Sequence, residues 1–599
     1  MRIPPVSLPC AVVYAAIYSM LCVPAFGADA WRNALAPAGQ PAAPLTLVDN
    51  GRAAFAILLP PDAAPPARKA ADDLGHWVEQ ITGARLPVVA VPAGPHVRLT
   101  TDAKLAGEQY SIAVDGGNLV LSGGPERGVV NAVYALLEED LGCRFYTNQS
   151  IRLPKSSTLA VAVVPRTYSP QLRLRDPFYF ASFDADWSLR NRTNAPKAAV
   201  PETSGGTINY AGADVHSHAD LLPASEYFKD HPDYFMLDAA GNRSRAQLCP
   251  THPEVAGIVT ARVLEMLAKR PNAEIVSVSK NDNNGDQICR CERCSKLREA
   301  EGGTDMGPQL VLVNAVAEAV EKAHPKVWVD TLAYIETVQP PKTMRPRKNV
   351  VIRLCNDVIG AWNTPFIPAR RTAMADLTRR WSAIHDRLSI WDYNVNFSHY
   401  LAPMPNMEVI ADNLRFWTEN KAVGVLTQGG YQSTSERDEL RSWVIAKLMW
   451  DPSRDGQALV DDFVAGHYGI AAPIISEYER LLAESAKTHA DELENRSGGI
   501  RYNMSLAFLS KDFLQKSQDV FARARQACGK DAALLARVER AELPVLYAML
   551  SQGPVTRDAL DRFERIGREA KVNYLAEGGI DLGHQVHLWR KQLPAESPK

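Results

Sequence analysis

"VWVDTLAYIET", Val327–Thr337, decides the fold class, because it is an apolar run that ends in polar and aromatic residues. Comparable runs recur through the middle of the chain: "EIVSVSKND", "NVVIRLCND", "LSIWDYNVNF" and "AVGVLTQGG". They alternate with helical patterns such as "QLVLVNAVAEAVEKA". Repeated strand–helix units predict parallel strands, and their number fits a (β/α)8 barrel. An open doubly wound sheet is the alternative, although no glycine-rich phosphate loop follows the early strands.

Two further regions flank the predicted barrel. Before it, short buried strands alternate with two amphipathic helices, which is the pattern of a small α/β domain. After it, apolar residues recur at helical spacing to the end of the chain. The sequence therefore predicts an α/β protein with a small N-terminal α/β domain, a central (β/α)8 TIM-like barrel and a C-terminal helical domain. We place the bounds of these domains at residues 28–165, 166–432 and 433–599.

Residues 1–27 have the layout of a secretory signal peptide. Arg2 precedes the apolar run "AVVYAAIYSMLCVPAFG", and cleavage is expected near Gly27. A membrane anchor is the alternative, but the run is short for a span of ~20 residues. No later segment reaches ~18 uninterrupted apolar residues. We therefore expect an exported protein, periplasmic or secreted, with no membrane span in the mature chain.

Charge and composition narrow the classes of partner. The 599 residues carry 66 Lys and Arg against 68 Asp and Glu, which gives a formal net charge of −2. Because there is also no long basic run, nucleic acid and anionic membrane surfaces are not expected partners. With 46% hydrophobic residues, the chain is long enough to bury several cores. The sequence does not indicate the oligomeric state.

Polar and aromatic side chains gather where the predicted strands end, and in a barrel the carboxyl ends of the strands carry the function. Carboxylates and amides interleaved with Trp and Tyr suit a sugar, because polar groups address hydroxyls and aromatic faces stack on the ring. In "EIVSVSKND", Val276 and Val278 would face the helices, which directs Asn281 inward. The alternative is that these residues only cap strands and bond loops. The candidates are Asn281, Asp282, Tyr334, Glu336, Asp357, Trp391, Asp392, Tyr393 and Asn396.

The pair His216 and His218, in "HSH", has a spacing that could bind a metal ion. No third ligand is close in the sequence, so we interpret the pair as substrate-binding or structural histidines rather than as a metal site.

A cluster of cysteines follows the strand that ends in Asn281. Cys289, Cys291 and Cys294 contain the CxxC spacing of zinc sites, and Cys249 in "QLCPTHPE" is a possible fourth ligand. The second distant pair of a zinc motif is missing, and disulfides are common in exported proteins. We therefore favour disulfide bonds that hold the loop, with structural zinc and free thiols as alternatives. No cofactor is expected otherwise.

Several stretches resemble known families. "ADDLGHWVEQITGARLPV" and "RGVVNAVYALLEEDLGCRFY" resemble the small domain that precedes the barrel in bacterial α-glucuronidases and β-hexosaminidases. "VSVSKNDNNGDQICRCERC", "TLAYIETVQPPK" and "LSIWDYNVNFSHYLAPMPN" resemble the bacterial family called domain of unknown function 4838. Part of that family is classed as glycoside hydrolase family 163, retaining endo-β-N-acetylglucosaminidases. The resemblance implies an exported bacterial glycosidase on a (β/α)8 barrel.

The expected function is therefore a glycoside hydrolase that acts on N-acetylhexosamine-containing glycans by a retaining mechanism. By position, Asn281 with Asp282 would orient the 2-acetamido group of the substrate, and Glu336 would be the acid/base. An α-glucuronidase-like hydrolase is the enzyme alternative, and Arg353 or His216 would then bind the uronate carboxylate. The non-enzyme alternative is a glycan-binding protein without a working acid. Carbohydrate is the expected partner in every case.

Overall fold

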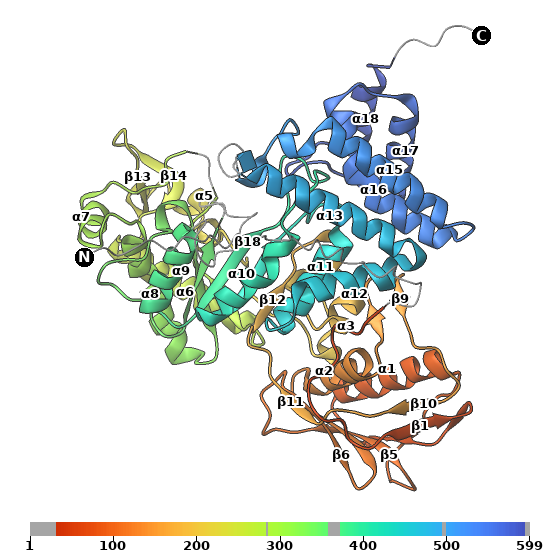
Figure 1. Cartoon of the computed structure of the whole chain (residues 1–599). Helices are drawn as coiled ribbons and strands as arrows, with labels where there is room; N and C mark the ends of the chain where they lie inside the picture. Colours follow the sequence, from red (N-terminus) through yellow and green to blue (C-terminus); the bar gives the residue numbers. More distant parts are fainter. Residues whose placement is uncertain (1–30, 283–284, 357–371, 491, 494–498, 594–599) are drawn as a thin grey trace, which may run out of the picture. The chain divides into compact units, whose positions relative to one another are not determined.

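The first sheet of the chain is mixed and contains a tight hairpin. The computed structural model (Figure 1) describes residues 31–282, 285–356, 372–490, 492–493 and 499–593. Six strands lie in the order β11-β6-β7-β5-β3-β4, and a smaller sheet has the order β10-β1-β2. Gly116 and Gly117, between β6 and β7, take φ values of 55° and 79°, which a two-residue hairpin turn requires. The strands of this region are β1 (Leu45–Asp49), β2 (Arg52–Ala53), β3 (Ala56–Leu58), β4 (Val88–Val89), β5 (His96–Thr101), β6 (Tyr110–Asp115), β7 (Asn118–Gly123), β8 (Arg144–Phe145), β9 (Ile151–Arg152), β10 (Leu159–Val161) and β11 (Arg166–Tyr168).

Two helices accompany this sheet, as the apolar spacing predicts. α1 (Pro65–Thr82) begins with proline and ends at Gly83, whose φ of 80° lets its N–H reach the carbonyl of Glu79. α2 (Gly128–Ala135) is buried along its whole length and continues into a π-helical turn, Leu136–Asp140. These elements form a core with the strands, so the small α/β domain expected before the barrel is present.

The central sheet has six parallel strands in the order β12-β19-β18-β17-β16-β15, and an isolated parallel bridge joins Tyr210 to Ile275. The sheet is curled, and the predicted TIM-like β/α class is confirmed; the described residues supply these six strands and the bridge. The strands are β12 (Leu174–Asp176), β15 (Ile275–Ser277), β16 (Trp328–Ala333), β17 (Val350–Cys355), β18 (Leu388–Tyr393) and β19 (Ala422–Gln428), with the hairpin β13 (Phe235–Leu237) and β14 (Arg243–Leu248) before β15.

Helices cover the outer face of the central sheet; α8 packs on β16 and β17, and α10 packs on β19. Val276, Ile352 and Ile390 belong to the core that these helices share with the strands. Because side chains alternate along a strand, Ser277, Arg353 and Trp391 point to the inner face. The helices of this region are α3 (Ala185–Arg190), α4 (His218–Leu221), α5 (Ala224–Tyr227), α6 (Pro253–Lys269), α7 (Glu292–Ala300), α8 (Met306–Ala323), α9 (Thr372–Ile384), α10 (Met407–Glu419) and α11 (Asp438–Trp450).

The rest of the described chain is helical, as predicted, and its apolar side chains extend the core of the central domain. One stretch of the described residues, Gly456–Thr488, has the length and hydropathy of a membrane span. It comprises two helices whose apolar residues, including Phe463 and Leu482, are buried in that core. The predicted domain bounds stay predictions. The helices are α12 (Gly456–Tyr468), α13 (Ala472–Thr488), α15 (Lys511–Ala527), α16 (Ala532–Gln552), α17 (Arg557–Glu569) and α18 (Leu582–Arg590).

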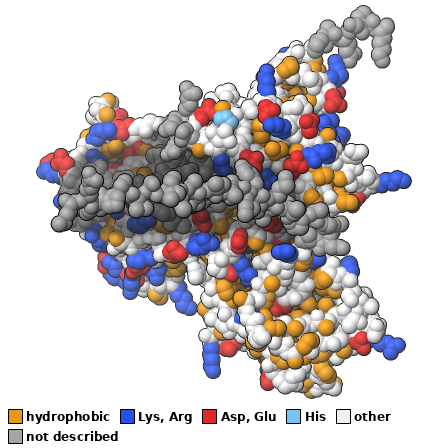
Figure 2. Space-filling model, viewed as in Figure 1, with side chains coloured by type: hydrophobic (Ala, Val, Ile, Leu, Met, Phe, Trp, Pro, Cys, Tyr) orange, Lys and Arg blue, Asp and Glu red, His pale blue; other side chains and the backbone are white. Residues whose placement is uncertain are grey.

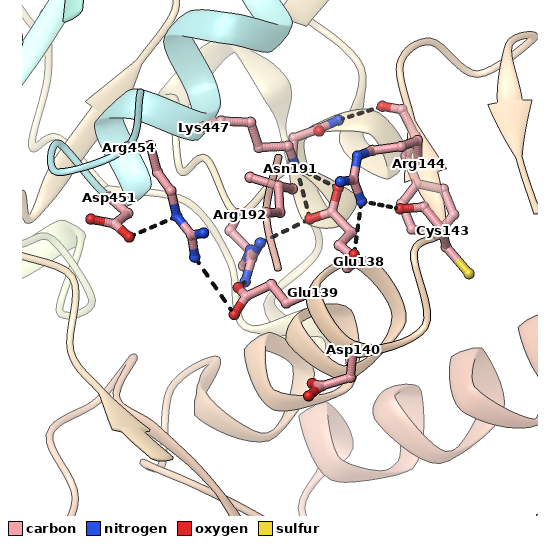
Figure 3. A network of polar contacts seen from close by, with 12 residues as sticks. Glu138, Glu139, Asp140, Cys143, Arg144, Asn191, Arg192, Lys447, Asp451 and Arg454 are labelled. Carbon is pink, nitrogen blue, oxygen red and sulfur yellow. Dashed lines mark hydrogen bonds and ion pairs between the residues drawn. The ribbon is translucent and has the colours of Figure 1, made fainter. Parts of the chain in front are cut away.

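A buried ionic network joins the first α/β domain to the helices behind the central sheet (Figure 3). Glu138, in the π-helical turn, accepts hydrogen bonds from Lys447 of α11 and from Arg192. Arg192 also donates to Glu139 at 2.7 Å. Because isolated charges are costly in a protein interior, these paired charges favour the observed packing of the π-helical turn against α11.

Positive and negative side chains are mixed on the surface, in keeping with their nearly equal numbers in the sequence. On the face drawn in Figure 2, Lys and Arg side chains are interspersed with Asp and Glu over the C-terminal helices. Hydrophobic side chains gather over the first α/β domain on the same face. Val88 and Val91, on and beside the edge strand β4, are exposed. Single exposed valines are ordinary on a protein surface and identify no partner.

Candidate active site

The carboxyl edge of the central sheet brings together side chains from neighbouring strands. Cys355 of β17 is paired in register with Trp391 of β18, and Tyr393 is paired with Gln428 of β19. Trp391 Nε1 donates to Gln428 Oε1 at 2.8 Å, and the Trp391 and Tyr393 rings stack with centroids 6.5 Å apart. Both rings are partly exposed. The edge therefore carries an aromatic platform beside an amide, a combination suited to binding a sugar ring.

The helical region adds a carboxylate to this edge, which the sequence did not indicate. Glu577 accepts from Gln428 Nε2 at 3.2 Å, from Tyr431 Oη at 3.5 Å and from Arg501 Nη2 at 2.7 Å. Its side chain remains 26% exposed. Glu577 and Gln428 are 149 positions apart, so no local pattern could have linked them. The edge is thus built by the barrel and by the helical region together.

A buried cation lies on the inner face of β17. Arg353 donates to Asp330 Oδ2 at 2.5 Å, to the Asp214 carbonyl at 3.0 Å and to the Tyr210 hydroxyl. Its guanidinium carbon is 5.6 Å from the Tyr210 ring centre and 5.7 Å from that of Trp391. Burial lowers the pKa of Arg353, but the combined attraction of Asp330, Tyr210 and Asp214 outweighs burial, so the pKa is raised. The Nη groups already have partners inside the barrel, which leaves them poorly placed for a substrate carboxylate.

A carboxyl group that titrates near neutral pH ends β12. Asp176 is 3% exposed, and its Oδ1 has no hydrogen-bond partner within the part of the chain that the structure describes. Burial and the charge of Asp214 raise the pKa of Asp176 to about 7, against the lowering effect of Arg353 and Lys197. The Lys197 ammonium group lies 4.3 Å from the Phe178 ring centre. No sequence pattern points to Asp176, because "RLRDPF" lacks the long apolar run of the other strands.

Glu336 follows β16 on a strained backbone. Ile335 has φ +47°, which places a β-branched residue in the left-handed region. Thr337 Oγ1 accepts from the Tyr334 N–H at 3.1 Å and donates to the Tyr334 carbonyl at 3.0 Å, so the turn is held from both sides. The Glu336 side chain is 17% exposed, and its Oε2 is 3.9 Å from Lys280 Nζ. Backbone strain that is held in this way is concentrated at functional sites.

Lys280, which no sequence pattern singles out, connects the ends of β15 and β16. Its Nζ donates to Asp305 Oδ2 and to the Gln287 carbonyl, both at 2.8 Å. The Asp305 N–H in turn donates to the Glu336 carbonyl at 3.1 Å. Arg298 Nη2 also donates to Asp305, at 3.0 Å. These contacts fix the ammonium group beside Glu336.

Asn281 and Asp282, the predicted pair at the end of the β15 segment, have different surroundings. Asn281 Oδ1 accepts from the Ala219 N–H at 2.9 Å, and its Nδ2 donates to the Ala246 carbonyl at 3.0 Å. Its amide therefore ties two loops together. Asp282 is exposed. Asp357, the candidate after β17, lies outside the described residues.

Asp392 and Asn396 lie away from the aromatic platform. Asp392 alternates with Trp391 along β18, and it accepts hydrogen bonds from Asn356 and Asn394 in a buried cluster. Burial raises the pKa of Asp392 to about 6, although these hydrogen bonds lower it. Asn396 is fully buried and donates to the Tyr502 carbonyl at 2.6 Å. The role of Asp392 and Asn396 in substrate binding stays a prediction. In the structure both side chains form hydrogen bonds within the protein.

His216 and His218 engage different partners. His216, with φ +53°, has its Nδ1 3.0 Å from the Lys280 carbonyl, so its ring supports the same strand end. His218 is buried, and its Nε2 lies 3.4 Å from Gln309 Nε2. Burial and the charge of Lys280 lower the pKa of His218 to about 3, which keeps its ring neutral. Among the described residues, one group of three or more side chains could hold a metal ion, and neither histidine belongs to it.

That group consists of the four cysteines assigned a structural role from the sequence. All four are buried, and no disulfide bond joins any of the cysteines within the described residues. The four Sγ atoms lie within 4.8 Å of one another. The structure therefore brings Cys249 to the CxC-x2-C segment, as the sequence suggested. The members are Cys249, Cys289, Cys291 and Cys294.

The fold is that of a β/α-barrel protein, and polar and aromatic side chains gather at the carboxyl edge of its central sheet. Residues 145–480 match the family model described as domain of unknown function DUF4838. Because this match spans more than half of the chain, the chain belongs to that family. No curated protein matches the sequence.

The solved structures that the chain matches include glycoside hydrolases. A family GH115 4-O-methyl-alpha-glucuronidase with specificity for decorated arabinogalactans aligns with a TM-score of 0.57 and 12% identity, over 88% of this chain and 77% of that chain. The Streptomyces plicatus beta-hexosaminidase gives 0.43 and 13%, over 71% and 92%. The Vibrio harveyi GH20 exo beta-N-acetylglucosaminidase gives 0.39 and 13%, over 72% and 77%. At this identity, the first of these shows a shared fold and nothing more.

Proposed function

We propose that the chain is an exported glycoside hydrolase of N-acetylhexosamine-containing glycans, with Glu336 as its acid/base. The observation that carries the proposal is the placement of Glu336. A partly exposed carboxylate stands at the carboxyl edge of a β/α barrel, beside the strained Ile335 and 3.9 Å from the Lys280 ammonium group. Barrel enzymes place their chemistry at this edge, and held strain marks functional positions.

The sugar-binding part of the proposal rests on the aromatic platform. A pyranose ring stacked on Trp391 and Tyr393 would direct its hydroxyls toward the amide of Gln428 and the carboxylate of Glu577. Arg353 of β17, whose guanidinium carbon is 5.7 Å from the Trp391 ring centre, adds a cation beside the platform. Similarity in fold to a GH115 glucuronidase supports the same class.

The mechanism we propose is retaining and substrate-assisted. In the first step Glu336 gives its proton to the glycosidic oxygen, while the carbonyl oxygen of the 2-acetamido group forms a bond to the anomeric carbon as the glycosidic bond breaks. Asp282 orients the acetamido N–H, since the amide of Asn281 is already bonded to two loops. In the second step water attacks the anomeric carbon and gives its proton to Glu336, while the bond between that carbon and the acetamido oxygen breaks. The free 2-acetamido group and the protonated Glu336 are thereby restored.

A uronate-bearing glycan is the second candidate substrate, and Lys280 favours it. A uronate carboxylate needs a cation in the pocket, and Lys280 is the one beside Glu336. Lys280 Nζ also donates to Asp305 and to the Gln287 carbonyl, but its side chain is 12% exposed. Arg353 has its Nη groups bonded to internal partners and is only 2% exposed. A glycan-binding protein without catalysis is the remaining alternative.

A substrate screen tests the proposal. Purified protein would be incubated with aryl N-acetylglucosaminide, aryl glucuronide and a biantennary N-glycan, and the anomeric protons of the products followed by NMR. We expect cleavage beside an N-acetylhexosamine with retained configuration. Inversion would exclude the substrate-assisted route, and cleavage of the glucuronide alone would select the second candidate. Binding without cleavage of any substrate would contradict the enzyme proposal.

A further inference from the structure

The four buried cysteines come from two separate parts of the chain. Cys249 directly follows β14, the second strand of the hairpin. Cys289 and Cys291 precede α7, and Cys294 lies in its first turn. With Met236 of the hairpin they form a small buried cluster apart from the main core. The cluster therefore sits where the hairpin meets the start of α7.

The spacing of the sulfur atoms is that of a tetrahedral metal site. Cys249 Sγ is 3.5 Å from Cys291 Sγ and 3.9 Å from Cys294 Sγ, and all four sulfurs lie within 4.8 Å of one another. Four thiolates at ~2.3 Å from a central Zn²⁺ are ~3.8 Å apart at the corners of a regular tetrahedron. The observed distances lie on both sides of that value.

A disulfide explains the arrangement less well. A disulfide joins two sulfurs at ~2.05 Å. One disulfide among these four cysteines would leave the other two thiols packed against the bond. The Sγ–Sγ distances of 3.5 and 3.9 Å are far longer than that bond, and all four sulfurs converge on one point rather than forming two separate pairs. Convergence of four buried sulfurs from two segments is the signature of a structural zinc site, in which every coordination position is filled by protein.

The surroundings suit thiolate ligands. The Leu237 N–H donates to Cys289 Sγ at 3.4 Å, and the Thr251 hydroxyl lies 3.0 Å from Cys294 Sγ. Cys291 is the N-cap of α7, so the positive end of that helix faces the cluster. N–H and O–H donors to sulfur, like the outer contacts of known metal sites, orient the ligands and stabilise their negative charge.

We propose that Cys249, Cys289, Cys291 and Cys294 bind one Zn²⁺ in a closed tetrahedral site. The zinc fastens the β13–β14 hairpin to the start of α7, and its role is structural because four protein ligands leave no position open for substrate.

The site also acts on the candidate active site through a short path. Gln247, two residues before Cys249, accepts from the Asn281 N–H at 3.0 Å and donates to the Asn281 carbonyl at 2.7 Å. Asn281 adjoins Lys280, which holds its ammonium group beside Glu336. Fixing the hairpin therefore fixes the end of the β15 segment. The zinc assignment itself does not depend on the proposed activity.

Metal content and thiol content of the purified full-length protein test the assignment. We expect one zinc ion per chain, and seven titratable thiols outside residues 1–27 when the protein is denatured with a chelator and no reductant. Cys294→Ser should lose the zinc. Cys528→Ser, which alters a buried cysteine of the helical region, should retain it.

A second measurement covers the case in which Cys294→Ser fails to fold. X-ray absorption at the zinc edge of the wild-type protein should show four sulfur neighbours at ~2.3 Å. Zinc-free protein with two or four thiols missing would establish disulfides and overturn the proposal. Stoichiometric iron in place of zinc, nitrogen or oxygen neighbours in the absorption spectrum, or a folded Cys294→Ser protein that keeps its zinc would overturn it as well.

Discussion

Replacing Lys447 with methionine tests whether the buried ionic network holds the first domain to the central one. Lys447 Nζ lies 2.5 and 2.7 Å from the two carboxylate oxygens of Glu138, and both side chains are fully buried (Figure 3). Removing one partner of a buried pair costs ~3–5 kcal/mol, because the other charge is left without compensation. Arg192 still donates to Glu138 at 2.8 Å, so we expect a loss near the lower end, about 3 kcal/mol.

Urea unfolding, followed by tryptophan fluorescence and by circular dichroism, measures this loss. Lys296→Met is the matched control, because Lys296 pairs with Glu292 on α7 with side chains 75% and 79% exposed. An exposed pair of this kind is worth less than about 1 kcal/mol. Adding Glu138→Gln to Lys447→Met should recover stability, because it removes the carboxylate that has lost one of its two cations, and Arg192 keeps Glu139 as a partner. The reasoning is refuted if Lys447→Met behaves like the control, or if the double variant is no more stable than the single one.

Three further predictions concern the inner face and edge of the barrel. Asp176→Asn should raise stability by up to about 4 kcal/mol at pH 8 and leave it unchanged at pH 4. The pKa of Asp176 is about 7 in the folded chain and ~3.9 in the unfolded chain. Between these pH values the folded chain binds one more proton than the unfolded chain, so wild-type stability falls as pH rises. Urea titrations at pH 4 and pH 8 check this, and equal effects of the substitution at both pH values would disprove it. Trp391→Ala should raise KM by about tenfold through loss of the stacking face, with a smaller change in kcat, in initial-rate kinetics; an unchanged KM would remove the ring from the site. Asp282→Asn should lower kcat by at least ~10²-fold with an unchanged unfolding midpoint, since the side chain is exposed, and full activity would exclude its orienting role.

The features that the sequence predicts well are those carried by local patterns. Alternation in "EIVSVSKND" places Val276 and Val278 in the core, and the spacing in "CRCERC" brings three cysteines together. The apolar period of α1 and its closing Gly83 likewise follow from a few adjacent residues.

The features that the sequence could not predict depend on contacts between distant segments. Glu577 reaches Gln428 across 149 positions, and Lys447 reaches Glu138 across 309. The sequence around a single carboxylate or ammonium group does not show which residue will be its partner, because that depends on how whole domains pack together. The amide of Asn281 shows the same limit, since nothing in its own strand reveals that two loops occupy both of its polar atoms.

The central claim is that Glu336 is the acid/base of a glycoside hydrolase, and Glu336→Gln tests it most directly. The variant keeps the size of the side chain and removes its titrating proton. The measurement is kcat on the glycan that the substrate screen selects, beside Asp376→Asn as a control on the exposed face of α9. We predict a loss of ~10²-fold or more for Glu336→Gln, an unchanged unfolding midpoint, and a wild-type rate for the control. A Glu336→Gln rate within about twofold of the wild type would contradict the account.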